Sequence, residues 1–324
     1  LLLPAVACVA EIIPINTRKP LWGYKSMVYG VMVLGFLSFI VWAHHMYLTG
    51  MGSSVSTFFQ TTTVLISVPS VVLITSLLIS LWGGSIRFSM PMIWACAFLP
   101  MFGIGGLTGL PLAFNLVDLH LHDTYYVIGH FHYVVAPGIL FGLFAGIYYW
   151  YPKMFGRYMS NVLGHLHFWP SLIFINLVFF PMLLQGMAGF HRRWYNGGDG
   201  YLPAEGSEDV FGQTVTEWIG LNQLMSISVF CLAAAQIPFI INLFTAWKTG
   251  KKVENDNPWD ATTLEWATPT PPGHGNFTFD VAAYRGPYEY SRPDCEEDFY
   301  PQWHEPVETT SSDLDAGIAP KDSH

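Results

Sequence analysis

The segment HDTYYVIGHFHYVVAPGILFGLFAGIYYWY, residues 122–151, decides the fold. From residue 124 to residue 151 it is almost entirely apolar, and this exceeds the roughly 20 helical residues that cross a bilayer. Two histidines, His130 and His132, lie within the apolar run. Polar side chains are costly in hydrocarbon and usually face the protein interior. The segment therefore predicts a membrane-spanning helix that carries functional imidazoles.

The rest of the sequence repeats this apolar pattern. Hydrophobic residues make up 52% of the 324 residues and charged residues only 11%, whereas charged residues are about a quarter of an ordinary soluble domain. The opening stretch, 1–13, is too short to span and is interpreted as the end of a preceding helix. The sequence predicts an all-α polytopic membrane protein, with a transmembrane domain at 1–252 in a lipid bilayer. Further spans are expected at 25–49, 57–83, 90–114, 166–189 and 218–246.

Basic residues separate the two sides of the membrane. If the chain crosses at every span, nearly all the lysines and arginines of the connections fall on one side, which the positive-inside rule assigns to the cytoplasm or matrix. Only Arg192 and Arg193 fall on the outer side. Residues 253–324 then form an acidic, loosely structured tail on the inner side, which holds most of the net charge of −9.

The histidines indicate metal centres. His44 and His45 lie late in the first full span and His130 and His132 lie early in the fourth, so both pairs are near the outer surface. Successive helical residues are turned by about 100°, and His130 and His132 therefore project about 200° apart. They must serve two centres, with Phe131 between them. Neutral imidazole is a good ligand for haem iron and for copper.

His44 and His45 project only about 100° apart and can share one copper or iron ion, whose remaining ligand must come from elsewhere. The outer connections carry further polar residues at the same end. Two adjacent guanidiniums are suited to hold haem carboxylates through bidentate bonds. His122 and Asp123 could bind magnesium, although Asp123 could instead cap a helix. The residues of this outer group are Asp118, His120, His122, Asp123, Arg192 and Arg193.

These residues closely resemble subunit I of the haem–copper oxygen reductases, the cytochrome c oxidase family. The resemblance rests on Val-Trp-Ala-His44-His45-Met, Gly-Gly-Leu-Thr-Gly at 105–109, the run from His122 to Tyr133, and Arg192-Arg193. It extends to about Pro272 and includes the bacterial-like Asn-Pro-Trp-Asp-Ala-Thr-Thr-Leu-Glu-Trp at 257–266. It implies that the six spans are the last six helices of a twelve-helix bundle.

The resemblance also implies site roles. His44 and His45 would bind the active-site copper (CuB), His130 the high-spin haem a3 iron and His132 the low-spin haem a iron. Asp118, Arg192 and Arg193 would hold propionates, and His122 and Asp123 magnesium.

The implied function is that of an aa3-type terminal oxidase. It would reduce O2 to water with electrons from cytochrome c or a similar donor, coupled to proton uptake, and whether it pumps protons is left open. The implied partners are the amino-terminal half of subunit I, subunit II with its dinuclear copper, and subunit III. The implied location is a bacterial cytoplasmic membrane or the mitochondrial inner membrane, and no nucleic acid is expected to bind.

The sequence departs from the family pattern in two ways. The family's His-Pro-Glu-Val-Tyr motif, with the third copper ligand, would fall before residue 1, so the chain is expected to be a fragment of a longer subunit or, as the alternative, part of a split one. Leu73 replaces the lysine of the family's second proton channel, and Ala136 lies where a serine is common. Two other functions stay open: a nitric oxide reductase-like enzyme, and a degenerate haem-binding membrane subunit.

Overall fold

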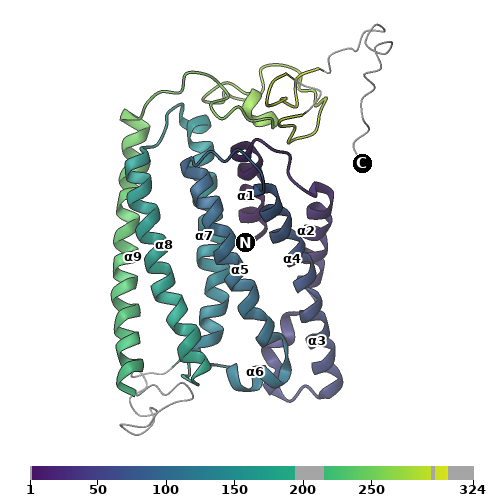
Figure 1. Ribbon diagram of the computed structural model, residues 1–324, viewed down its shortest axis with the longest axis vertical. Helices are drawn as coiled ribbons and strands as arrows, with labels where there is room; N and C mark the ends of the chain where they lie inside the picture. Colours follow the sequence, from purple (N-terminus) through teal and green to yellow (C-terminus); the bar gives the residue numbers. More distant parts are fainter. Residues whose placement is uncertain (1, 194–214, 293–295, 306–324) are drawn as a thin grey trace.

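The computed structural model describes residues 2–193, 215–292 and 296–305, with the side chains of 215–219 left aside. In this part of the chain, long helices run side by side along one axis, and β-pairing is limited to isolated bridges (Figure 1). The helices are α1 (Leu2–Thr17), α2 (Tyr24–Ser38), η1 (Trp42–Thr49), α3 (Ser53–Leu65), α4 (Ser67–Leu81), α5 (Met90–Ala113), α6 (Asn115–Leu121), α7 (Tyr125–Phe155), α8 (Asn161–Met187), α9 (Val215–Thr249) and η2 (Leu264–Ala267).

The predicted all-α membrane fold is confirmed. Six helical stretches of the described residues are long and apolar enough to cross a bilayer, and each coincides within a few residues with a predicted span. The opening helix α1 is shorter, as expected. The stretches are Tyr24–Thr49, Ser53–Leu81, Met90–Ala113, Tyr125–Phe155, Asn161–Met187 and Gly220–Thr249.

Two of the spans are not the continuous α-helices that the sequence predicts. The first leaves α-helical geometry after Ser38 and continues as the 3₁₀ helix η1, in which the His44 N–H bonds the Val41 carbonyl at 3.1 Å. The second breaks at Ile66, close to Pro69, whose ring removes a helical N–H and crowds the preceding turn. His44 and His45 therefore lie on a tighter turn, about 120° apart rather than 100°.

Helix α7 is the central helix, packed against α1, α5 and α8. Its contact with α5 is close because Gly105 has no side chain. A Cβ at that position would lie 2.8 Å from Val134 Cγ2 and 2.9 Å from the Val134 backbone nitrogen. Small residues let transmembrane helices approach in this way. Nearer the inner end, the buried Trp94 of α5 packs between aromatic rings of α7 and α8, including Phe141 and Phe168.

The acidic tail is not loosely structured where it is described, and that expectation is wrong for these residues. Residues 253–292 and 296–305, which we call the inner segment after the side predicted for them, lie across one end of the bundle (Figure 1). Trp266 and Tyr290 are fully buried there. The Lys153 ammonium, at the inner end of α7, donates to the carbonyls of Asp256 at 2.8 Å and Thr268 at 2.5 Å. A lysine at a helix end thus binds the polar segment, and the composition of the segment alone does not predict this contact.

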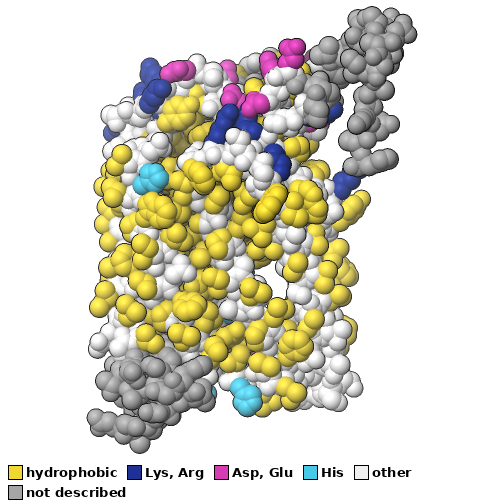
Figure 2. Space-filling view, viewed as in Figure 1, with side chains coloured by type: hydrophobic (Ala, Val, Ile, Leu, Met, Phe, Trp, Pro, Cys, Tyr) yellow, Lys and Arg dark blue, Asp and Glu magenta, His cyan; other side chains and the backbone are white. Residues whose placement is uncertain are grey.

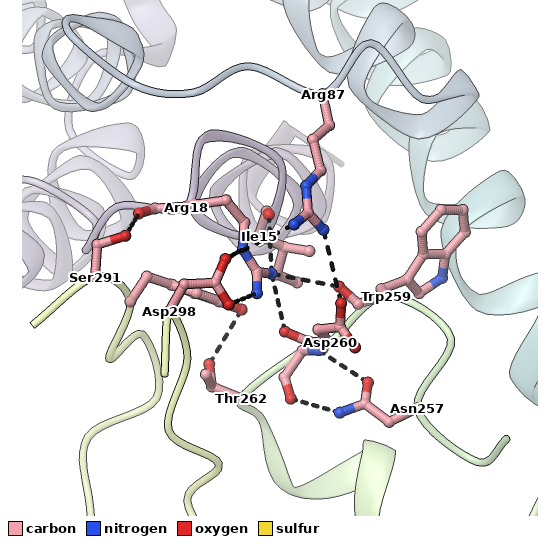
Figure 3. Close-up of polar contacts among 11 residues, drawn as sticks. Ile15, Arg18, Arg87, Asn257, Trp259, Asp260, Thr262, Ser291 and Asp298 are labelled. Atoms are coloured by element: carbon pink, nitrogen blue, oxygen red, sulfur yellow. Dashed lines mark hydrogen bonds and ion pairs between the residues drawn. The ribbon is translucent and has the colours of Figure 1, made fainter. Parts of the chain in front are cut away.

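Arg18, at the end of α1, makes the principal ion pair with this segment. Its Nε and Nη2 atoms each lie 2.8 Å from an oxygen of Asp298, and its guanidinium also donates to the Asp260 carbonyl at 3.0 Å (Figure 3). The guanidinium is buried and lies 5.0 Å from the centre of the Tyr290 ring. The hydrogen bonds and charge of Arg18 hold the pKa of Asp298 below its ordinary value of 3.8.

We predict that Asp298→Asn loosens the inner segment. The loss should be roughly 1–2 kcal/mol, low in the range for charge-assisted hydrogen bonds because Asp298 is half exposed. Hydrogen exchange of the 257–292 amides in the purified complex should therefore become about 5- to 30-fold faster. Because the folded pKa is lowered, wild-type protection is full above pH 3.8 and falls as the pH drops through the lowered pKa. Asp280→Asn, at an exposed position, is the control. Equal amide exchange rates in the two variants would show that the Arg18–Asp298 pair does not hold the inner segment in place.

Candidate metal centre

A cavity of about 460 Å³ lies between η1, α3, α4, α5 and α7, towards the outer end of the bundle. Its size is within the usual range for cofactor pockets. Most of its wall is apolar, from residues such as Ile74, Phe102 and Val134. Four imidazoles also line it, from three different parts of the chain: His44, His45, His122 and His130.

His130 enters this cavity from α7 in a fixed orientation. Its Nδ1 lies 2.9 Å from the Gly105 carbonyl and 3.2 Å from the Thr108 hydroxyl. Because a carbonyl can only accept, Nδ1 carries the proton and Nε2 keeps its lone pair. This is the arrangement of metal-binding histidines, whose second nitrogen usually donates to a carbonyl or carboxylate. Gly109 leaves room for the ring, since a Cβ there would lie 2.7 Å from His130 Cε1.

His44 and His45 converge on the same cavity from η1. Their Nε2 atoms are 2.9 Å apart, and the Nδ1 atom of His44 lies 3.1 Å from the Thr63 hydroxyl. Two imidazole nitrogens bound about 2 Å from one ion lie about 3 Å from each other, so the spacing fits a shared metal. Among the described residues, no three His, Cys, Asp or Glu side chains gather as a metal site. The described residues thus offer such an ion two ligands.

His132 faces the other side of α7. Its Nδ1 lies 2.8 Å from the Ile128 carbonyl, which again leaves Nε2 as the free ligand atom. Its ring stacks on Phe179 of α8, with centroids 4.6 Å apart and an angle of 16° between the planes. Phe131, between the two histidines, is partly exposed and packs on the His132 ring at 4.3 Å. His130 and His132 therefore lie against different helices.

The outer rim of the cavity is charged. Arg192 donates from Nε to Asp123 Oδ1 at 2.9 Å, and its Nη2 lies 2.8 Å from the same oxygen. Arg193 is more distant, at 3.6 Å, and largely exposed. Burial acts to raise the pKa of Asp123, but the hydrogen bond and charge of Arg192, with His122 and Arg193, lower it overall. Asp123 and Arg192 both line the cavity while bonded to each other.

Asp118 completes the rim from α6. It is buried, and its Oδ2 has no hydrogen-bond partner among the described residues, although His122 Nδ1 lies 3.4 Å away. Burial raises the pKa of Asp118 against the opposing effect of His122. A buried carboxyl oxygen without a donor is costly, so this atom is suited to a ligand group that brings a proton or a cation. His120, the other histidine of the predicted outer group, lies on α6 and is exposed.

The sequence did not predict that several further residues contact the histidines of the site or make room for them. Gly105, Thr108 and Gly109 were noted only as part of a motif, although the i, i+4 spacing of the two glycines places them on one face of α5. Thr63 and Phe179, which contact His44 and His132, gave no signal in the sequence. Their roles depend on how separate helices pack.

Comparison with known proteins identifies the family. The family model described as Cytochrome C and Quinol oxidase polypeptide I matches residues 1–231. The chain belongs to this family. It is 41% identical over 290 residues to cytochrome c oxidase subunit 1 of Synechocystis sp., which covers 90% of the chain and 49% of that protein. It is 42% identical over 277 residues to cytochrome c oxidase subunit 1 of Alkalihalophilus pseudofirmus, covering 86% of the chain and 42% of that protein.

Other relatives agree. The alternative cytochrome c oxidase subunit 1 of Bradyrhizobium diazoefficiens is 39% identical over 303 residues, covering 93% of the chain and 49% of that protein. A solved heme-copper terminal oxidase dimer matches with a TM-score of 0.65 at 23% identity, over 77% of this chain and 47% of that chain, and supports the fold. The chain spans about half the length of the curated relatives that it matches. It is an integral membrane protein of a family that carries respiratory electrons.

We predict that His130→Leu and His132→Leu remove different spectral bands. The two rings face different helices, so each substitution should remove one ligand and leave the other centre intact. In the purified complex, His130→Leu should abolish the carbon monoxide-binding haem signal, and His132→Leu the low-spin signal. Loss of the same single band in both variants would overturn the two-centre arrangement.

Proposed function

We propose that the chain forms part of the catalytic core of an aa3-type oxygen reductase, which reduces O2 to water with electrons from cytochrome c or a similar donor. One observation supports this most directly: imidazoles from η1 and α7 line a single cavity. His44 and His45 approach each other as a pair, and His130 enters from another helix with its Nε2 free. His130 would hold the iron of a high-spin haem in this cavity, and His44 and His45 would supply two of the ligands of a copper ion.

A haem iron and a copper ion, when bound, supply the one-electron and oxygen chemistry that amino acids lack. The chain's own residues hold and orient them. The Gly105 carbonyl fixes the ring plane of His130 and raises the basicity of its Nε2, and Thr63 orients His44. The mostly apolar wall limits water around the cavity, which strengthens electrostatic interactions within it.

His132 would bind the low-spin haem on the α8 side of α7. Its ring is held by the Ile128 carbonyl and by stacking on Phe179. His130 and His132 are separated along the backbone by Phe131 alone, on one long helix. This gives the two haem sites a short and rigid connection.

The charged rim would hold the haem carboxylates. Arg192 lines the cavity, and Arg193 is exposed and lies 3.6 Å from Asp123, so both could donate to propionates. Asp118 Oδ2, which has no hydrogen bond among the described residues, could share a proton with a propionate. His122 and Asp123 would bind magnesium. Asp123 could keep its bond to Arg192 in this role, because Arg192 contacts only Oδ1 and the other oxygen, Oδ2, lies 3.7 Å from His122 Nε2.

The orientation and partners are also proposals. The inner segment would lie on the cytoplasmic or matrix side, because the basic helix ends lie with it. The amino-terminal half of subunit I would supply the third copper ligand and the second low-spin haem ligand. Subunit II, with its dinuclear copper, and subunit III would complete the assembly.

Oxygen consumption by the purified, complete complex tests this function. His45→Asn should lower turnover at least 100-fold, because the copper loses one of its ligands, while the low-spin haem spectrum is unchanged. His165→Asn, at an exposed position on α8, is the matched control and should retain turnover. Consumption of nitric oxide in place of oxygen would support the nitric oxide reductase alternative. Intact spectra with no turnover in the wild type would support the degenerate subunit.

A separate prediction concerns Leu73, which is fully buried on α4. Leucine cannot carry a proton, so protons must reach the cavity by another route, such as Ser70, which lines the cavity one turn away, or the proposed amino-terminal partner. Leu73→Met conserves volume and should leave oxygen turnover within about twofold of wild type. A severe loss of turnover with both haem spectra intact would show that Leu73 has a role beyond packing.

A further inference from the structure

Two groups of cations at the inner end of the bundle differ in whether carboxylates neutralise them. The first group is neutralised by the inner segment. Arg18 pairs with Asp298 at 2.8 Å, and Arg87 lies 3.7 Å from both Asp260 and Asp298 (Figure 3). These pairs lie over α1 and the connection between α4 and α5. The inner segment thus covers this part of the basic surface with carboxylates.

The second group lies at the inner ends of α8 and α9 and is not neutralised. Residues 156–158 pair with residues 250–253 through backbone bonds, including Tyr158 N–H to the Lys251 carbonyl at 2.9 Å. Arg157 donates to the Gly250 carbonyl at 2.6 Å, which carries no net charge. Within the described part of the chain, Lys248 and Lys252 have no carboxylate within ion-pair distance, whereas Lys251 lies 3.0 Å from Glu254. We call Arg157, Lys248 and Lys252 the basic corner.

An apolar stripe on α9 leads directly to this corner. Ile237, Ile241, Phe244 and Lys248 follow at intervals of four, three and four residues, so they share one helix face. The three apolar side chains are 46–60% exposed, and only 17% of the span is buried. Figure 2 shows Lys and Arg side chains gathered above a hydrophobic surface at the end of the molecule where α9 meets the inner segment.

Trp247 marks the depth of the corner. It is 58% exposed and precedes Lys248 on the last turn of α9. Exposed tryptophans favour the level of the lipid headgroups, where one end of the ring is apolar and the other is wet. The lysines of the corner therefore lie at headgroup depth, and the stripe lies at the depth of the acyl chains.

We propose that the inner end of α9 is a binding site for an anionic glycerophospholipid. Its phosphate would lie among Arg157, Lys248 and Lys252, and an acyl chain would lie along Ile241 and Phe244. The charge favours an anionic headgroup, since basic side chains at this depth attract anionic lipid. The adjoining stripe favours an amphiphile over free phosphate. This inference is independent of the oxygen chemistry.

The test uses the complete complex, delipidated in neutral detergent and titrated with fluorescent phosphatidylglycerol or phosphatidylcholine. The wild type should bind phosphatidylglycerol more tightly than phosphatidylcholine. The double variant Lys248→Gln/Lys252→Gln should bind phosphatidylglycerol roughly 20-fold more weakly, about fivefold for each lysine, with phosphatidylcholine unchanged. Lys25→Gln, at an exposed lysine in the first turn of α2, is the matched control and should bind like the wild type.

Two further measurements separate the other occupants of this surface. Phe244→Ala should weaken the binding of both lipids, because it removes an apolar side chain that would contact an acyl chain and leaves the basic corner unchanged. Inorganic phosphate at equal concentration should not displace the labelled lipid, and displacement would show an anion site without a lipid. Equal phosphatidylglycerol binding by the double variant and the wild type, with unchanged haem spectra, would overturn the proposal. A dimer that forms through this face and excludes lipid would overturn it as well.

Discussion

The hydrogen bond between His130 Nδ1 and the Gly105 carbonyl is the contact on which the candidate centre depends. In hydrocarbon no water can satisfy an imidazole N–H, so the protein must supply an acceptor. The carbonyl does so and leaves Nε2 directed into the cavity. This contact is available only because α5 and α7 approach closely at Gly105, where a Cβ would lie 2.8 Å from Val134 Cγ2. The packing of α5 against α7 therefore determines which nitrogen of His130 carries the proton and where its ring points.

The same constraint explains the other histidines. His132 finds its acceptor within its own helix, at the Ile128 carbonyl, and His44 finds the Thr63 hydroxyl. Each of these three rings has one nitrogen fixed by the protein and the other left for a metal. The broken geometry of η1 contributes as well, since it brings the His44 and His45 Nε2 atoms to 2.9 Å. An imidazole pair that close is favourable when a cation lies between them.

Much of the fold could be predicted from the sequence, because span length follows from bilayer thickness. The two faces of α7 could also be predicted, since helical rotation alone separates His130 from His132. The break after Ser38 could not, because apolar composition continues through it, whereas Pro69 was a signal for the break at Ile66 that the sequence reasoning did not use. Thr63 and Phe179 were missed for a different reason: their roles arise from contacts between segments distant in sequence.

The inner segment shows why net charge was a poor guide to order. Its acidic composition predicted a loose tail, yet Asp298 forms a bidentate pair with the buried Arg18. A carboxylate-rich segment remains solvated when it has no counter-ions, and it orders when the helix ends present cations at the same surface. The cations that orient a membrane protein in the bilayer thus serve a second purpose here. Those over α1 hold the chain's own carboxylates, whereas Lys248 and Lys252 at the end of α9 have no carboxylate within ion-pair distance in the described part of the chain.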